Sequence, residues 1–260
     1  MLEVGTFDMS ADVLFASAPR DERDAALDRH RLPVEPIVFH VLPLVVDLDG
    51  RRVVIDPGAL ESGAMARAFE AARIAPESLD AVVVTHGHAD HYGGVVAADG
   101  GPFFPRARHH LQRVEWEHWT APDNPEPGHA ETFRRLLLPL RDLFDLADGP
   151  TEPVPGFRVV PTPSHSPGHQ AVLVADRLLH TGDAVLTVLG VERPEWVASF
   201  ELWPGDVVAT RRELLASAAR DSLVTMLCHT PAPGLGHVVP HGDGYAWQPL
   251  GAAGGLATSS

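Results

Sequence analysis

Cysteine is almost absent from this sequence: Cys228 is the only one in 260 residues. A single thiol cannot form a disulfide within the chain, and such low cysteine use is typical of a reducing compartment. The first 12 residues lack the basic segment and apolar core of a signal peptide. No apolar run approaches the ~20 residues that a membrane-spanning helix needs. We therefore expect a cytoplasmic protein with no membrane partner.

Basic residues are also scarce. The chain has 20 Lys and Arg against 35 Asp and Glu, which gives a formal net charge of -15. Proteins that bind nucleic acid need a basic face toward the phosphates, so we expect no nucleic-acid partner. A hydrophobic content of 45% is enough for a large core. We expect a single domain over residues 1–250 and a disordered tail over the Gly/Ala/Ser-rich residues 251–260.

Apolar runs and amphipathic segments alternate through both halves of the chain. The predicted strands are residues 37–42, 44–46, 51–55, 81–85, 157–161, 171–175, 177–181 and 223–227. The predicted helices are residues 62–73, 114–119, 129–144 and 207–219. Pro43 indicates a bulge or an edge position between the first two strands. This mixture favours an α/β sandwich of layers over a barrel or a helical bundle.

Four potential metal ligands follow the apolar run 81–84 within six residues: His86, His88, Asp90 and His91. His86 and His88 are two residues apart, so a short extended segment can direct both imidazoles at one point. Asp90 and His91 come next and can serve a second point nearby. Imidazole suits zinc and similar metals, and a carboxylate adds an oxygen ligand. The spacing therefore predicts a hydrolytic site with two metal ions.

Three later loops, each at the end of a predicted strand, carry further ligand candidates. They are residues 163–169 with His165 and His169, residues 181–183 with Asp183, and residues 228–231 with His229. Gly and Pro in these loops can fix the backbone that presents a ligand. His237 and His241 compete with His229, but only His229 directly follows a strand. The residues alone do not decide between His165 and His169.

The ordered set resembles the metallo-β-lactamase-fold hydrolase superfamily over roughly residues 35–250. The residues that carry the resemblance are Thr85–Gly94 as T-H-G-H-A-D-H-Y-G-G, then Ser166–His169, Thr181–Asp183 and His229. The segments Cys228–Val238 and Gly244–Trp247 are similar to the methyl parathion hydrolase-like and lactonase-like branch.

The resemblance implies a four-layer αββα sandwich with the metal site at one edge of the two sheets. It implies His86, His88 and His169 on one metal, and Asp90, His91 and His229 on the other. Asp183 would bridge the two ions together with a hydroxide, and Asp90 and Asp183 would be catalytic. His165 would then contact a metal ligand without binding the metal itself, or stabilise the loop. The ions implied are two divalent metals, zinc first, with manganese, iron or cobalt as alternatives.

The expected activity is metal-dependent hydrolysis of a small, rather apolar ester, lactone or phosphotriester. The alternative is hydrolysis of a thioester of the acyl-CoA, acyl-carrier or glutathione type. Trp196, Phe200 and His237 are the candidates for the substrate pocket. Leu186 stands where some lactonases have a tyrosine, which argues against a tyrosine-assisted mechanism. The expected partners are a small-molecule substrate and, in a homodimer, a second copy of the chain.

Cys228 adjoins a proposed ligand, whereas true class B β-lactamases often place a cysteine on the second metal itself. Penicillin-type substrates are therefore not expected. We expect the Cys228 side chain to pack as a small buried hydrophobic group.

Overall fold

The first of two large sheets has five strands, all in the first 147 residues. The computed structural model describes residues 1–251, so the predicted tail lies, except for Gly251, outside the described residues. The strand order is β3-β4-β5-β6-β7. Their bounds are β3 Leu44–Leu48, β4 Arg51–Ile55, β5 Ala81–Val83, β6 Arg108–Gln112 and β7 Phe144–Ala147. Strands β4 to β7 run parallel, so the loops that follow them emerge at one edge of the sheet.

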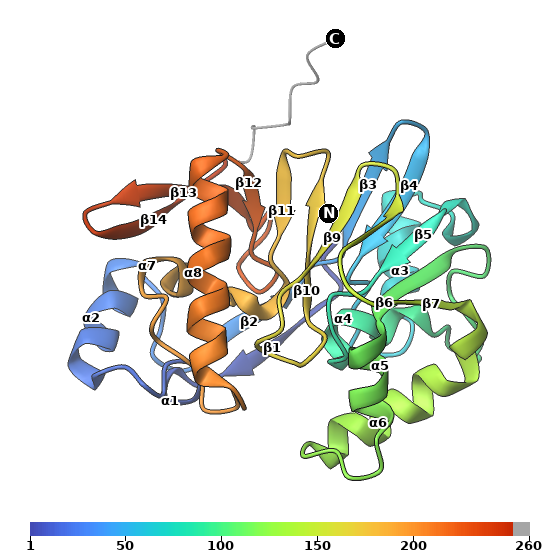
Figure 1. The fold of residues 1–260 in the computed structure, drawn as a ribbon, viewed down its shortest axis with the longest axis horizontal. Helices are drawn as coiled ribbons and strands as arrows, with labels where there is room; N and C mark the ends of the chain where they lie inside the picture. The colour runs from blue at the N-terminus through green and yellow to red at the C-terminus, as the bar shows by residue number, and fades with distance from the viewer. Residues whose placement is uncertain (252–260) are drawn as a thin grey trace.

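The second large sheet has seven strands in the order β14-β13-β12-β11-β10-β9-β8. Their bounds are β8 Thr151–Val154, β9 Phe157–Pro161, β10 Gln170–Val174, β11 Leu178–His180, β12 Val224–Met226, β13 Leu235–His241 and β14 Gly244–Pro249. Strands β11 and β12 are parallel, and the other pairs are antiparallel. In Figure 1 this sheet runs from the yellow strands at the centre to the red hairpin.

Apolar side chains point to both faces of each large sheet, so one face packs on the other sheet and the opposite face packs under helices. On β4, Val53 and Ile55 enter the apolar cluster between the two sheets, whereas Val54 enters the cluster under the helices. On β10, Val172 faces the other sheet and Ala171 faces outward, because successive side chains of a strand point to opposite faces. Figure 1 shows the helices α5 and α6 beside the first sheet and α8 across the second. The αββα sandwich predicted from the resemblance is confirmed.

Helices α5, α6 and α8 pack on the outer faces of the two large sheets, whereas α1 and α2 pack with the strand β2 and residues 186–196. Their bounds are α1 Ala11–Leu14, α2 Arg20–Arg29, α3 Ala64–Ala72, α4 Ala89–Tyr92, α5 Arg113–Thr120, α6 Pro127–Leu137, α7 Val188–Glu192 and α8 Pro204–Arg220. Four short 3₁₀ segments in the described residues join them: η1 Pro76–Ser78, η2 Gly93–Val95, η3 Leu138–Leu143 and η4 Gly182–Ala184. Leu214, Leu215 and Ala218 of α8 pack on the second sheet, as the amphipathic pattern predicted.

A two-stranded sheet joins β1 Gly5–Met9 to β2 Ile37–Val41. It was not predicted, because residues 1–36 contain no sustained apolar alternation. Pro43 separates β2 from β3, which belong to different sheets, and β3 is an edge strand. The chain therefore changes sheet at a residue that has no N–H to contribute to a ladder.

The predicted helix over residues 129–144 was too long. It starts earlier, at Pro127, and its α-helical part ends at Leu137. Residues 138–143 form the 3₁₀ segment, and Phe144 already begins β7. Pro139 explains the change, since a proline ring inside an α-helix removes a hydrogen bond and clashes with the preceding turn.

We expect Phe133→Ala to lower the free energy of unfolding by about 3–5 kcal/mol, because it removes a large ring from a packed core. Phe133 is fully buried, and its ring meets those of Tyr92 and Trp116 at centroid distances of 5.3 and 5.4 Å. Urea unfolding followed by circular dichroism measures the change. Val114→Ala is the control, because Val114 is 48% exposed and should change stability by less than about 0.5 kcal/mol. A similar small effect for both variants would contradict the core assignment.

Candidate metal centre

Four loops from the two sheets meet at one edge of the sandwich. The loop after β5 carries His86 and His88 and leads into α4 with Asp90 and His91. The other three loops follow β9, β11 and β12 in the second sheet. Gln170 at the start of β10 joins the sheets here, because its backbone N–H and its side-chain Nε2 donate to the carbonyls of Thr85 and Val84. The strand ends therefore fix the loops relative to one another.

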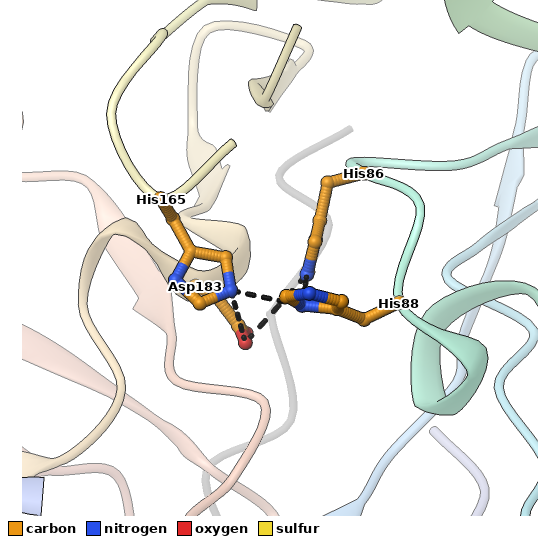
Figure 2. Close-up of side chains that lie close together, drawn as sticks. All are labelled: His86, His88, His165 and Asp183. Atoms are coloured by element: carbon orange, nitrogen blue, oxygen red, sulfur yellow. Dashed lines mark hydrogen bonds and ion pairs between the residues drawn. The ribbon is translucent and has the colours of Figure 1, made fainter. Parts of the chain in front are cut away.

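The first group of donors contains His86, His88, His165 and Asp183 (Figure 2). Nδ1 of His88 lies 2.9 Å from Nε2 of His86 and 3.0 Å from Nε2 of His165. Oδ2 of Asp183 lies 3.8 Å from His86 and 3.6 Å from His165. All four donor atoms lie within 4.8 Å of one another, which is the separation expected around a single metal ion.

The second group contains His91, Asp183, Cys228 and His229. Oδ1 of Asp183 lies 3.2 Å from Nε2 of His91 and 3.0 Å from Nε2 of His229. Asp90 approaches the same two nitrogens, with Oδ2 at 3.4 and 3.6 Å. Asp183 thus presents one carboxylate oxygen to each group, which is the arrangement of a carboxylate that bridges two ions.

The ring nitrogen that faces away from the donors is hydrogen-bonded in four of these histidines. His86 Nδ1 lies 3.1 Å from Thr85 Oγ1, and His91 Nδ1 lies 2.8 Å from Asp56 Oδ2. The other two partners are the Glu201 carboxylate for His165 and the His40 carbonyl for His229. Such outer hydrogen bonds orient a metal-ligating imidazole and fix its tautomer. The rings are therefore held with Nε2 directed into the site.

Burial and neighbouring charges shift the histidine pKa values in opposite directions in the two groups. Burial lowers the pKa of His86 and His88 well below the ordinary value, so both are neutral and have a free lone pair. Burial also opposes charge on His91, but the Asp183 and Asp90 carboxylates raise its pKa well above the ordinary value. Asp183 stays ionised despite burial, because His91 and His229 hold its pKa well below the usual range. Positive charge is thus favoured where a cation would sit.

The structure does not place His169 in the first donor group, contrary to the prediction. His165 lies there instead. Nε2 of His169 accepts a hydrogen bond from the Asp183 backbone N–H at 3.0 Å, and Nδ1 lies 2.8 Å from Thr162 Oγ1. Both ring nitrogens are therefore engaged. The His169 carbonyl also accepts from the Thr162 N–H, which ties His169 to the β9–β10 hairpin. His165 lies further out in the same loop, so its ring reaches the donors.

Glu115 of α5 is the main supporting residue that the sequence interpretation missed. Its carboxylate is fully buried and accepts four hydrogen bonds. The donors are the backbone N–H groups of Gly87 and Gly168, the Trp119 indole and the Ser166 hydroxyl, at 2.6–2.8 Å. No sequence pattern marks a helical glutamate as such an acceptor, because three of its four partners come from two distant loops.

Two glycines allow α5 to approach these loops. A Cβ on Gly87 would lie 2.2 Å from the Trp119 indole, and one on Gly168 would lie 2.4 Å from the backbone nitrogen of Glu115. Both distances are far too short for a real contact. Glycine is therefore required where the loops with His86, His88 and His165 rest on the helix.

The sequence analysis also did not identify Asp56 and Glu201 as residues that hold the site histidines. Asp56, directly after β4, accepts from the Thr85 N–H and from its hydroxyl, both at 2.7 Å, as well as contacting His91. The Glu201 side chain is fully buried and lies 3.1–3.2 Å from His165 Nδ1. A carboxylate at a strand end was a usable signal for Asp56, whereas Glu201 stands in an irregular segment with no such signal.

The three substrate-pocket candidates have different outcomes. Phe200 contacts the site, with its ring 5.9 Å from that of His165. Trp196 is buried in the cluster formed with the N-terminal segment and meets the Phe15 ring at 6.1 Å. His237 does not reach the site, because its Nδ1 bonds the carbonyl of Leu223 at the opposite end of β12. For Trp196 and His237 the structure thus contradicts the pocket prediction.

The end of the Pro-rich loop and the first turn of α6 place two further polar side chains, Glu126 and His129, beside the first group. Donor atoms of Glu126 and His129 lie within 4.8 Å of one on His88. Trp119 packs beside His88 at a ring distance of 5.1 Å, and Trp203 is 37% exposed.

Within residues 1–251, no helix is long and apolar enough to cross a membrane.

Comparison with known proteins supports one family. Residues 36–227 match the model of the metallo-beta-lactamase superfamily. An N-acyl homoserine lactonase of Bacillus cereus is 32% identical over 99 residues, which is 38% of this chain and 34% of the relative. The chain thus matches about a third of that relative's length. A related lactonase, AiiA of Bacillus thuringiensis subsp. kurstaki, is 30% identical over 114 residues, 44% of this chain and 39% of its own.

Solved structures share the fold over nearly the whole chain. The hydrolase AbOPH of the beta-lactamase superfamily superposes with a TM-score of 0.85 at 24% identity, covering 96% of this chain and 93% of its own. The dizinc quorum-quenching lactonase AidC superposes with a TM-score of 0.86 at 18% identity, covering 96% and 92%. At these identities the likeness shows the fold alone.

We expect Glu115→Gln to lower the free energy of unfolding of the metal-free protein by at least about 2 kcal/mol. A glutamine has one acceptor oxygen and turns an NH₂ group toward donors, which leaves buried N–H groups without acceptors. Chemical unfolding in the presence of a chelator measures the change. Glu117→Gln, on the exposed face of the same helix, is the control and should stay within about 0.5 kcal/mol. Equal stability of the two variants would show that Glu115 does not hold the loops.

Proposed function

Because this chain belongs to the metallo-beta-lactamase superfamily, we propose that it is a binuclear metal-dependent hydrolase of a small, rather apolar ester, lactone or phosphotriester. The observation that carries the proposal is the pair of donor groups that share Asp183. A carboxylate placed between two sets of imidazole nitrogens is suited to bridging two metal ions.

The donor set fits divalent transition metals, with zinc first. Nε2 of His91 is buried, makes no hydrogen bond and lies 3.2 Å from Oδ1 of Asp183, as expected for a metal-ligating nitrogen. We assign His86, His88 and His165 to one ion, Asp90, His91 and His229 to the other, and Asp183 to both. When bound, two such ions activate a water as the nucleophile and polarise the substrate's oxygen.

The side chains of the site provide proton handling and orientation. Asp90 stays ionised although it is buried, because His91 lowers the pKa of its carboxyl strongly. Its Oδ2 lies at the edge of the second group, and the side chain is 16% exposed. This oxygen can accept a proton from the attacking water and return it to the leaving group.

An apolar substrate is favoured by the side chains near the site. The Phe200 ring lies 5.9 Å from that of His165, and the buried Trp119 packs 5.1 Å from the ring of His88. The partial match to N-acyl homoserine lactonases supports a lactone among the candidate esters. Leu186 is buried among apolar residues, so no tyrosine hydroxyl assists from that position. Thioester hydrolysis is the alternative on the same metal site.

The test is a hydrolysis panel of lactones, aryl esters, phosphotriesters and thioesters on protein reconstituted with defined metals. We expect two metal ions per chain, loss of activity on chelation, and turnover of a lactone or ester above that of thioesters. His88→Ala should reduce turnover at least ~100-fold, because it removes a ligand. His30→Ala is the control, since His30 pairs with Glu192 on the surface. Full activity of His88→Ala, or of metal-free protein, would refute the proposal.

We expect Glu201→Gln to weaken metal binding about 10–100-fold, the usual effect of losing the outer partner of a metal-ligating histidine. Glutamine cannot act as a charged acceptor for the His165 Nδ1–H. Competition with a chromogenic chelator measures the affinity without reference to activity. Glu195→Gln is the matched control, because Glu195 is exposed in the same segment. Equal affinities in the two variants would show that Glu201 does not orient His165.

A further inference from the structure

The ring of Phe39 lies nearly parallel to the imidazole of His229. The two ring centroids are 4.7 Å apart, and the angle between the ring planes is 16°. Phe39 is in β2 and is only 2% exposed. His229 belongs to the second donor group, where its Nε2 lies 3.0 Å from Oδ1 of Asp183. Phe39 therefore stacks on a proposed metal ligand without offering a donor atom of its own.

The backbone beside Phe39 also holds His229. The carbonyl oxygen of His40 lies 2.9 Å from Nδ1 of His229, and the His40 N–H donates to the His229 carbonyl at 3.3 Å. A hydrogen bond at Nδ1 fixes the tautomer and the direction of the ring, but the ring can still rotate about that bond. A parallel aromatic ring at contact distance restricts this rotation. The two contacts together keep Nε2 directed at Asp183.

Strand β1 supports Phe39 in turn. Phe7 is its partner across the β1–β2 ladder, and their ring centroids are 5.4 Å apart. The Phe7 ring also meets the His229 ring edge to face at 5.9 Å. Leu14 of α1 joins Phe39 in the same apolar cluster. The match to the superfamily model begins at residue 36, so these N-terminal supports lie outside it.

We propose that Phe39 is a positioning residue for His229, and that strand β1 stabilises the second metal site by holding Phe39. The proposal rests on the binuclear site proposed above and deepens it. Because Phe39 has no ligand atom, it acts on the metal only through the orientation of the His229 ring. The N-terminal segment thereby gains a role in metal binding that the donor atoms alone do not reveal.

The zinc affinity of Phe39→Leu tests the proposal. Leucine keeps an apolar side chain at this position but has no ring to stack on His229. We expect the second zinc ion to bind about 10-fold more weakly, as when a ligating histidine loses an outer partner, and the first to bind within about twofold of the wild type. Competition with a chromogenic chelator measures the two affinities in turn. The binding step that His229→Ala weakens most identifies the second site.

Phe15→Leu is the matched control. Phe15 is 5% exposed and belongs to the same apolar cluster, but its ring packs against Trp196. This variant should leave both zinc affinities within about twofold of the wild type. Equal weakening of both sites in Phe39→Leu, or the same loss in Phe15→Leu, would indicate a general loss of packing and overturn the proposal.

A double-mutant cycle separates positioning from packing. If Phe39 acts through His229, then Phe39→Leu should change the second-site affinity less than twofold when residue 229 is already alanine. A purely structural contribution would persist in that background. A further ~10-fold loss there would therefore refute the role of Phe39.

Hydrogen exchange tests the same coupling in the wild type, without a substitution. Coupling between two sites is reciprocal, so bound zinc should stabilise the pairing of β1 with β2 by a similar factor. We expect zinc to slow exchange of the β1 amides about 10-fold more than that of the amides of β14, at the far edge of the second sheet. Equal slowing of the two strands would contradict the coupling.

The outcomes separate the two proposals. Two bound zinc ions, with the same second-site affinity in Phe39→Leu as in the wild type, would overturn the role of Phe39 and leave the binuclear site standing. Failure of the wild type to bind a second zinc ion would overturn both.

Discussion

The shared carboxylate of Asp183 is the constraint on which the rest of the site depends. A buried ionised group is stable only when opposite charge and hydrogen bonds compensate it. Asp183 meets this requirement by directing one oxygen at His86 and His165 and the other at His91 and His229. The four histidines come from three loops on two sheets, so the carboxylate can be compensated only when the sandwich is complete. The donor groups can therefore form only when the whole sandwich is folded.

Three further carboxylates hold those loops in place from outside the donor groups. Asp56 fixes Thr85 and His91, Glu201 fixes His165, and Glu115 joins the loops of Gly87 and Gly168 to α5. Each supporting group is buried and accepts hydrogen bonds from more than one atom or with both oxygens. This rigidity would suit the proposed pair of ions, because ligands held at a fixed separation need little rearrangement on binding. Phe200 and Trp203 are more exposed than these three carboxylates.

Much of the fold was predictable because the strands with strong signals are buried on both faces. The segments predicted as strands over residues 51–55 and 81–85 are rich in valine, and the structure has strands at Arg51–Ile55 and Ala81–Val83. The amphipathic segment over 207–219 lies within helix α8. Residues 5–9 and the hairpin of β13 and β14 were missed, since they have weak alternation and gain their order by pairing with segments far along the chain or at a sheet edge. The 3₁₀ segment after Leu137 was missed although Pro139 marked it.

The sequence by itself determined which residue types are available to hold metal ions in this protein. The spacing of His86, His88, Asp90 and His91 after a buried strand, with Asp183 and His229 after later strands, already specified the residue types of a two-metal site. Only the tertiary structure decided that His165 and not His169 faces the donors. That choice depends on the β9–β10 hairpin, whose hydrogen bonds engage both nitrogens of His169. It also placed Glu115 and Glu201 beside the site. Their roles arise from contacts between distant segments, which local spacing in a sequence does not record.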